Sequence, residues 1–123
     1  MSQHPTKLIA SAKAVLELQP ESIVYRRGSA YLARQAIESA VRLALGPNDR
    51  SRMQWRSRFL VLGVLQPEFS VGTGHQLWKL WSRTIHYHYY ELLPRHEVLA
   101  NRIEQSSSWI AGLEEHTSQQ AER

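Results

Sequence analysis

Apolar side chains return every three or four residues along most of the chain, which is the spacing of helices with one buried face. Proline and glycine interrupt this pattern at places where helices are expected to begin or end: Pro5, Pro20, Gly46, Pro47, Pro67 and Pro94. The intervals between them predict five helices, over about residues 6–18, 21–45, 49–66, 74–92 and 94–115. The second helix has the clearest apolar stripe, made of Ile23, Ala30, Ile37, Val41 and Ala44.

The connections between these predicted helices are short, which favours consecutive helices packed side by side in opposite directions. The sequence therefore predicts an all-α fold, an antiparallel up-down bundle of four to five helices, in a single domain over residues 1–123. The Val and Leu content of residues 59–65 also suits a strand, but no second strand-like run is available to pair with it. The apolar second half of this third helix is expected to be buried. We expect the polar residues 117–123 to form a frayed tail.

The composition is that of a globular protein and restricts the available chemistry. Apolar residues make up 42% and charged residues 21% of the chain, which does not fit a long disordered polymer. The absence of cysteine excludes disulfides and thiolate metal sites. The longest apolar stretch, near residues 59–65, is far shorter than the roughly 20 residues that cross a bilayer, and residues 1–6 carry no secretory pattern. We therefore expect a soluble, cytoplasmic protein without a membrane partner.

The charge balance is modestly basic and dominated by arginine. Fifteen Lys and Arg stand against eleven Asp and Glu, giving a formal net charge of +4. Arginine suits phosphate because its planar fork donates two parallel hydrogen bonds. Arg52 and Arg56 share a face of the third predicted helix and are candidates for contacts with an RNA backbone. A solvated helix start is the simpler interpretation. Arginines near the start of a helix oppose its macrodipole, however, and this unfavourable placement favours an anionic partner.

The fourth predicted helix gathers the side chains best suited to chemistry: Arg83, His86, Tyr87, His88, Tyr89 and Tyr90. Histidine exchanges a proton near neutral pH, and arginine holds a phosphate and stabilises the charge that develops on it. On an ideal helix Arg83 and His88 lie about 140° apart, so they do not share a face. A site shared between two protomers, or a distorted helix, would bring them together. His86 is nearer to the face of Arg83 and is the rival histidine.

The spacing Arg83-x4-His88 resembles the signature of HEPN domains, and His88-x-Tyr90 resembles the extended motif of HEPN toxins that are paired with minimal nucleotidyltransferase antitoxins. The flanking sequence is similar as well. Tyr31-Leu-Ala-Arg-Gln-Ala-Ile-Glu38 resembles the long second helix of these domains, and His88-Tyr-Tyr-Glu-Leu-Leu-Pro94 resembles the end of their motif helix. The resemblance extends from the first predicted helix to about the fifth.

The resemblance implies a homodimeric, antiparallel helical bundle with metal-independent endoribonuclease activity on RNA such as tRNA or mRNA. It implies that His88 acts as general acid and base in a cleft between protomers, while Arg83 holds the scissile phosphate and Thr84 assists by hydrogen bonding. The ribose 2′-hydroxyl would be the nucleophile. Tyr90 would be the position that a nucleotidyltransferase antitoxin modifies with AMP. The biological setting would be a toxin–antitoxin or antiphage defence system.

Simpler interpretations exist for each of these residues. His88 also suits a core histidine on an aromatic stripe, and Arg83 suits an ion pair with Glu91. The neighbouring tryptophans and tyrosines suit a core or a dimer interface. Thr84 stands where HEPN nucleases often carry Asn or Asp, which favours a non-catalytic HEPN domain that binds RNA, nucleotide or a protein partner. A helical interaction module that dimerises through its tryptophans is a third possibility.

Metal and cofactor sites are not expected from the sequence. His86-x-His88 is too small a ligand set for zinc without further ligands, and the six histidines show no zinc-binding spacing. The Gly72-Thr-Gly74 stretch is too short for a phosphate-binding loop and no Walker pattern follows it. We therefore expect neither a metal nor a cofactor.

Overall fold

The computed structural model describes residues 4–86 and 93–122, which form five α-helices and one short 3-10 turn. These elements are α1 (Pro5–Leu18), α2 (Ile23–Leu45), the 3-10 turn (Gly46–Asn48), α3 (Trp55–Leu65), α4 (Val71–Ile85) and α5 (His96–Ala121). No strand occurs in the described residues, so the predicted all-α fold class is confirmed there.

Local sequence explains where the second helix begins and ends. The hydroxyl of Ser22 accepts a hydrogen bond from the backbone N–H of Tyr25, which satisfies a donor in the first turn of α2. At the other end, Gly46 has a φ of 55° and its N–H donates to the carbonyl of Arg42. Glycine adopts positive φ without the steric cost that a Cβ would bring, so it ends the helix at this point.

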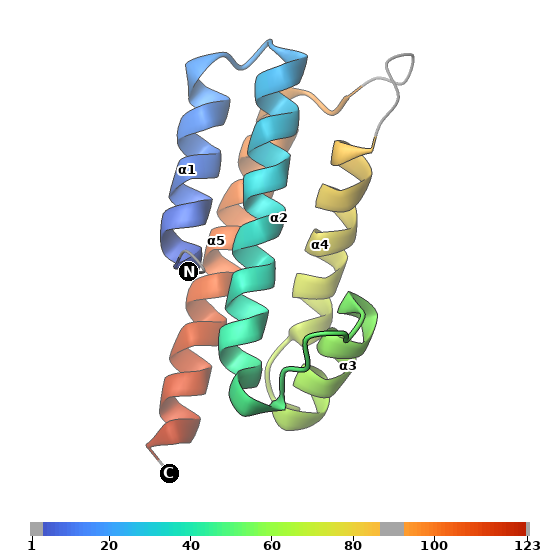
Figure 1. The fold of residues 1–123 in the computed structure, drawn as a ribbon. Helices are drawn as coiled ribbons and strands as arrows, with labels where there is room; N and C mark the ends of the chain where they lie inside the picture. The colour runs from blue at the N-terminus through green and yellow to red at the C-terminus, as the bar shows by residue number, and fades with distance from the viewer. Residues whose placement is uncertain (1–3, 87–92, 123) are drawn as a thin grey trace.

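Four long helices lie side by side and alternate in direction (Figure 1). The first, α1, packs against both α2 and α5, and α2 also packs against α4. The short helix α3 lies between α2 and α4 in the sequence and contacts both of them. The arrangement is an up-down helical bundle in which α2 is the central element.

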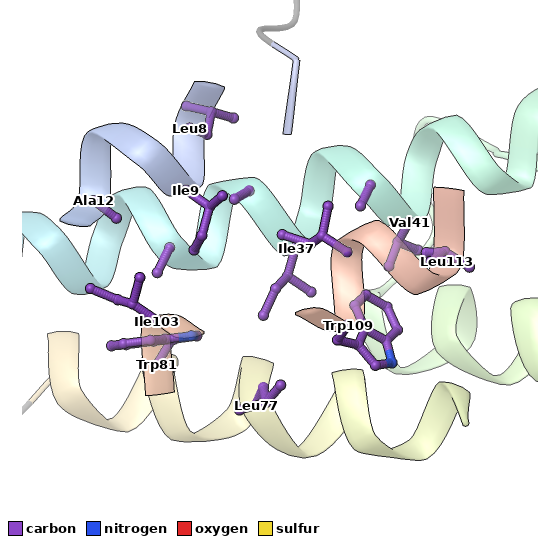
Figure 2. Packing of buried hydrophobic residues seen from close by; sticks show 14 of the residues in the cluster. Leu8, Ile9, Ala12, Ile37, Val41, Leu77, Trp81, Ile103, Trp109 and Leu113 are labelled. Carbon is purple, nitrogen blue, oxygen red and sulfur yellow. The ribbon is translucent and has the colours of Figure 1, made fainter. Parts of the chain in front are cut away.

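The core runs along α2 and is filled from the helices around it (Figure 2). Small residues of α2 allow close approach of its neighbours, while large side chains fill the remaining space. Trp81 of α4 is fully buried, and its indole N–H donates to the hydroxyl of Ser106 at 3.0 Å. The indole N–H of Trp109 donates to the carbonyl of Ser70 at 2.9 Å. Both polar N–H groups are satisfied, so these aromatic residues can be buried without a large desolvation cost.

The predicted helix boundaries differ from the structure in α3, α4 and α5. The third helix begins at Trp55 rather than near Asp49, because the preceding residues form a turn. The fourth begins at Val71 rather than at residue 74 and is described as far as Ile85, while residues 87–92 of the predicted helix lie outside the described residues. The fifth begins at His96, so Pro94 precedes the helix instead of occupying its first turn.

The apolar second half of α3 is only partly buried, contrary to the expectation from its composition. Phe59 and Leu62 belong to the core, while Leu60, Val64 and Leu65 are exposed. The reason is geometric: α3 lies at the edge of the bundle, and a surface helix buries only the side that faces its neighbours.

The C-terminal helix continues to Ala121, so residues 117–121 are helical where a frayed tail was expected. The hydroxyl of Thr117 donates to the carbonyl of Leu113 at 2.8 Å and accepts from the side-chain amide of Gln66 at 3.0 Å. His116 also contacts Gln66, at 2.9 Å. These contacts with Gln66, which follows α3, tie the last turns of α5 to the bundle.

No helix among residues 4–86 and 93–122 has the length and apolar character needed to cross a membrane.

The contact between α4 and α5 at Gly74 predicts a large difference between two glycine substitutions. A methyl group at Gly74 would overlap the indole ring of Trp109, whereas a methyl group at Gly63 of α3 would meet no atom within 4 Å. Gly74→Ala should lower the free energy of unfolding by about 1–3 kcal/mol through overpacking. Gly63→Ala should raise it by up to about 1 kcal/mol, because alanine is the better helix former. Urea denaturation of both variants measures the difference, and a Gly74→Ala variant as stable as Gly63→Ala would contradict this packing.

Candidate functional site

Arg83 lies in the last turn of α4 with its side chain exposed to solvent. Within residues 4–86 and 93–122 it forms no ion pair. The helix ends just beyond it, where the backbone N–H of His86 donates to the carbonyls of Ser82 and Arg83. A cation in the last turn interacts favourably with the negative end of the helix dipole. Arg83 is therefore an exposed arginine that no carboxylate within the described residues pairs with.

Of the two histidines near Arg83 in the sequence, His86 is among the described residues and His88 is not. His86 is the C-cap residue of α4 and is exposed. His88 and Tyr90 lie outside the described residues, so the pairing of Arg83 with His88 stays a prediction. The expected interaction of Arg83 with Glu91 lies outside them as well.

Thr84 is buried in α4, and its expected hydrogen bond to a phosphate stays a prediction. It is 1% exposed, and its hydroxyl donates to the carbonyl of Leu80 one turn earlier in α4, at 3.0 Å. The hydroxyl is therefore used within the helix. Helix α4 turns about 100° per residue, so the residue that follows an exposed arginine faces the core here.

The segment that leads into α5 is anchored to α2 and to the residues just before it. One guanidinium nitrogen of Arg26 donates to the carbonyl of Pro94 at 3.1 Å, and the other donates to the carbonyl of Glu21 at 3.4 Å. His96 lies 3.5 Å from a carboxylate oxygen of Glu21. These contacts fix the start of α5 at the same end of the bundle as Arg83 (Figure 1).

A second cluster with chemical potential lies near the start of α3 and α4. Four aromatic rings are grouped there, with the imidazole of His75 stacked on Phe59 at a centroid distance of 4.5 Å. The indole of Trp78 lies 6.1 Å from Phe59 and 6.3 Å from Trp55. An open cleft of about 640 Å³ adjoins these rings and is lined by Gln54, Trp55, Arg56, His75, Trp78 and Lys79. We call it the α3–α4 cleft.

Both tryptophans of the α3–α4 cleft are held by charged side chains. The indole N–H of Trp78 donates to a carboxylate oxygen of Glu38 on α2 at 2.9 Å. The guanidinium of Arg58 lies 4.4 Å from the ring centre of Trp55, and that of Arg42 lies 5.3 Å from it. Cation–π contacts at these distances are favourable, so the indoles are fixed in place without a ligand.

Arg58 is a structural residue rather than part of a basic surface. Its side chain is 4% exposed, and its Nε donates to a carboxylate oxygen of Asp49 at 2.8 Å. One terminal nitrogen donates to the carbonyl of Arg50 at 3.0 Å. Arg58 thus connects α3 to the turn that precedes it.

The candidate RNA-contacting residues Arg52 and Arg56 are both exposed, but they do not share a helix face. Arg52 lies in the turn before α3, so the helical spacing that placed it beside Arg56 does not apply. Arg56 lines the α3–α4 cleft together with Lys79. Burial lowers the pKa of His75, and the nearby charges of Lys79 and Arg56 lower that pKa further. Burial and both cations therefore favour the neutral form of the His75 imidazole.

The sequence did not single out His75, Trp55 or Lys79 as members of a site. A signal existed within α4, since His75, Trp78 and Lys79 follow the spacing that places side chains on one side of a helix. No sequence feature indicated that the start of α3 would meet them, because that contact depends on the packing of both helices against α2.

No group of three or more histidine, aspartate or glutamate side chains within residues 4–86 and 93–122 has a geometry suited to a metal ion. Comparisons of the chain with protein-family models, with curated proteins and with solved structures each find no match.

Proposed function

We propose that this protein is a HEPN-like, metal-independent endoribonuclease that cleaves RNA such as tRNA or mRNA. The observation that carries the proposal is the position of Arg83, an exposed arginine at the end of α4 that precedes His88 in an Arg-x4-His motif. The all-helical fold is compatible with it. A basic chain with a net charge of +4 also suits a polyanionic substrate.

The chemistry assigned to these side chains is an internal phosphoryl transfer. The ribose 2′-hydroxyl attacks the adjacent phosphorus, the new 2′-O–P bond forms and the P–O5′ bond breaks. A histidine takes the proton of the 2′-hydroxyl and a histidine returns a proton to the departing 5′-oxygen, which is general acid–base catalysis. His88 from each of two protomers would supply these groups. Arg83 would hold the scissile phosphate and stabilise its developing charge.

The proposal includes a homodimer, because the resemblance to HEPN domains implies that Arg83 and His88 meet in a cleft between two protomers. It also includes a toxin or antiphage role in the cytoplasm and an antitoxin of the nucleotidyltransferase class that transfers AMP to Tyr90. The support for these parts is the His88-x-Tyr90 motif alone.

A second candidate function is that of a non-catalytic HEPN-like domain that binds RNA, nucleotide or a protein partner. The burial of Thr84 favours it, because the polar group that often follows the catalytic arginine in HEPN nucleases is then missing from the solvent-facing side. The α3–α4 cleft also favours it, since exposed cations and fixed aromatic rings suit binding more directly than catalysis.

Cleavage of end-labelled tRNA and mRNA in the presence of EDTA tests the proposal. We expect cleavage that survives EDTA and leaves a 2′,3′-cyclic phosphate, because the assigned mechanism needs the 2′-hydroxyl and no metal. RNA with 2′-O-methyl groups is the matched control and should remain intact. Folded, dimeric protein that binds RNA in a salt-dependent way but never cleaves it would support the second candidate instead.

A further inference from the structure

The α3–α4 cleft has the size and composition of a ligand site that is separate from Arg83. Its volume of about 640 Å³ falls within the range of pockets that bind small molecules, roughly 300–1,000 Å³. Two helices contribute to it, with Gln54, Trp55 and Arg56 from the start of α3 and with His75, Trp78 and Lys79 from α4. A site built on helices holds its side chains more firmly than one built on loops.

The aromatic part of the cleft is arranged before any ligand arrives. Trp78 is held by Glu38, which lies 3.9 Å from Arg34 on the same helix. Trp55 is held by the guanidinium groups of Arg58 and Arg42. Little conformational freedom remains to be lost when a planar group packs against these indoles, and this order favours binding. Aromatic side chains are also platforms on which nucleobases stack.

The cationic part of the cleft lacks an acidic partner of its own. Arg56 and Lys79 are exposed, and neither forms an ion pair within residues 4–86 and 93–122. Glu38, the carboxylate that reaches this cluster from α2, contacts Trp78 and Arg34 through its Oε2 atom. Two cations without an acidic partner among the described residues can hold a phosphate group together.

We propose that the α3–α4 cleft binds a nucleotide unit, with its base packed against Trp55 and Trp78 and its phosphate between Arg56 and Lys79. The unit comes either from a free nucleotide or from a single-stranded nucleic acid. Aromatic stacking combined with cations along a groove is the way in which proteins bind single strands without strong sequence preference.

The position of Lys79 connects this cleft with Arg83. The two residues are four positions apart in α4, so they lie on the same side of the helix and about 6 Å apart along its axis. A strand that leaves the cleft along α4 would pass Arg83 next. The cleft would then be a subsite for the RNA substrate, and this role rests on the proposed function. Nucleotide binding in the cleft does not depend on the proposed function.

The test uses ligands that cannot be cleaved, namely AMP and a 2′-O-methyl oligoadenylate, with inorganic phosphate as the charge-only probe. Binding is followed by tryptophan fluorescence and by the NMR signals of His75. We expect AMP to bind at least tenfold more tightly than inorganic phosphate and to quench the indoles. A bound phosphate should raise the pKa of His75, because a nearby anion stabilises the imidazolium. Tighter binding of the oligonucleotide than of AMP assigns the cleft to a strand, and equal binding assigns it to a free nucleotide.

The variants separate this cleft from the rest of the basic surface. Arg56→Ala with Lys79→Ala should weaken AMP binding at least tenfold and reduce the salt dependence of oligonucleotide binding. Lys7→Ala, which removes an exposed lysine from α1, is the matched control and should change the affinity less than twofold. Trp78→Phe should weaken AMP but not inorganic phosphate. AMP binding that is absent in folded wild type, or that is unchanged in the double variant, would overturn the proposal, whether or not the protein cleaves RNA.

Discussion

Arg83→Ala and His88→Ala should each lower RNA cleavage by at least about 100-fold, while His86→Ala should leave it within a few-fold of wild type. The proposed site needs one arginine to hold the phosphate and one histidine to move protons, and each loss removes a group that acts in the transition state. His86 is the matched control, since it is an exposed histidine that ends α4 beside Arg83. Single-turnover cleavage of one labelled RNA in EDTA measures all three variants.

The stability of these variants shows whether a loss of cleavage is chemical. Arg83 is exposed and forms no ion pair within the described residues, so Arg83→Ala should change the free energy of unfolding by less than about 0.5 kcal/mol. Loss of cleavage in His86→Ala, with normal cleavage in His88→Ala, would transfer the catalytic role to the rival histidine. Normal cleavage in Arg83→Ala would remove the arginine from the mechanism.

The all-helical character of the fold could be predicted because the hydrophobic period and the breaking residues agree along the chain. In α2 the apolar stripe, the N-cap Ser22 and the terminal Gly46 indicate the same element, and the structure has it from Ile23 to Leu45. The limits of α3 and α4 were less predictable. Asp49 was a plausible first residue for α3, but its carboxylate pairs with Arg58 and the chain turns before Trp55.

The face that each helix buries depends on the helices around it, so the sequence did not predict which residues of α4 border the site. The fourth helix is aromatic on more than one side, and the sequence alone did not indicate that Trp81 fills the core while Trp78 borders a cleft. The same uncertainty affected Thr84, which was expected beside a phosphate and is buried. Composition indicated a basic, aromatic protein, but the tertiary packing decided which of these residues meet.

Arg58 illustrates the point most clearly, because residues 50–58 contain four arginines, Arg50, Arg52, Arg56 and Arg58, and only Arg58 among them is buried. Its side chain is 4% exposed and makes three polar or aromatic contacts, with Asp49, with the carbonyl of Arg50 and with the ring of Trp55. Each contact joins α3 to the turn before it or to the α3–α4 cleft. Arg58 therefore stabilises the fold and also holds one wall of the proposed ligand site.

Arg58→Ala should lower the free energy of unfolding by about 2 kcal/mol, because it removes a partly buried, charge-assisted hydrogen bond to Asp49 together with the contacts to the Arg50 carbonyl and the Trp55 ring. Arg56→Ala is the matched control. Arg56 lies two positions away on the same helix and is exposed, so its loss should change stability by less than about 0.5 kcal/mol. Urea denaturation of the two variants measures this difference in stability. In AMP titrations, Arg56→Ala should bind AMP more weakly than wild type although its stability is unchanged.

A double-mutant cycle with Asp49→Ala separates the ion pair from the other contacts of Arg58. Coupling of about 1–3 kcal/mol between the two positions is expected, since their side chains are in direct contact at 2.8 Å. A coupling near zero would mean that Arg58 stabilises the fold through Trp55 and the Arg50 carbonyl alone. An Arg58→Ala variant as stable as Arg56→Ala would contradict the buried position of Arg58, and with it the fixed orientation of Trp55 on which the nucleotide site depends.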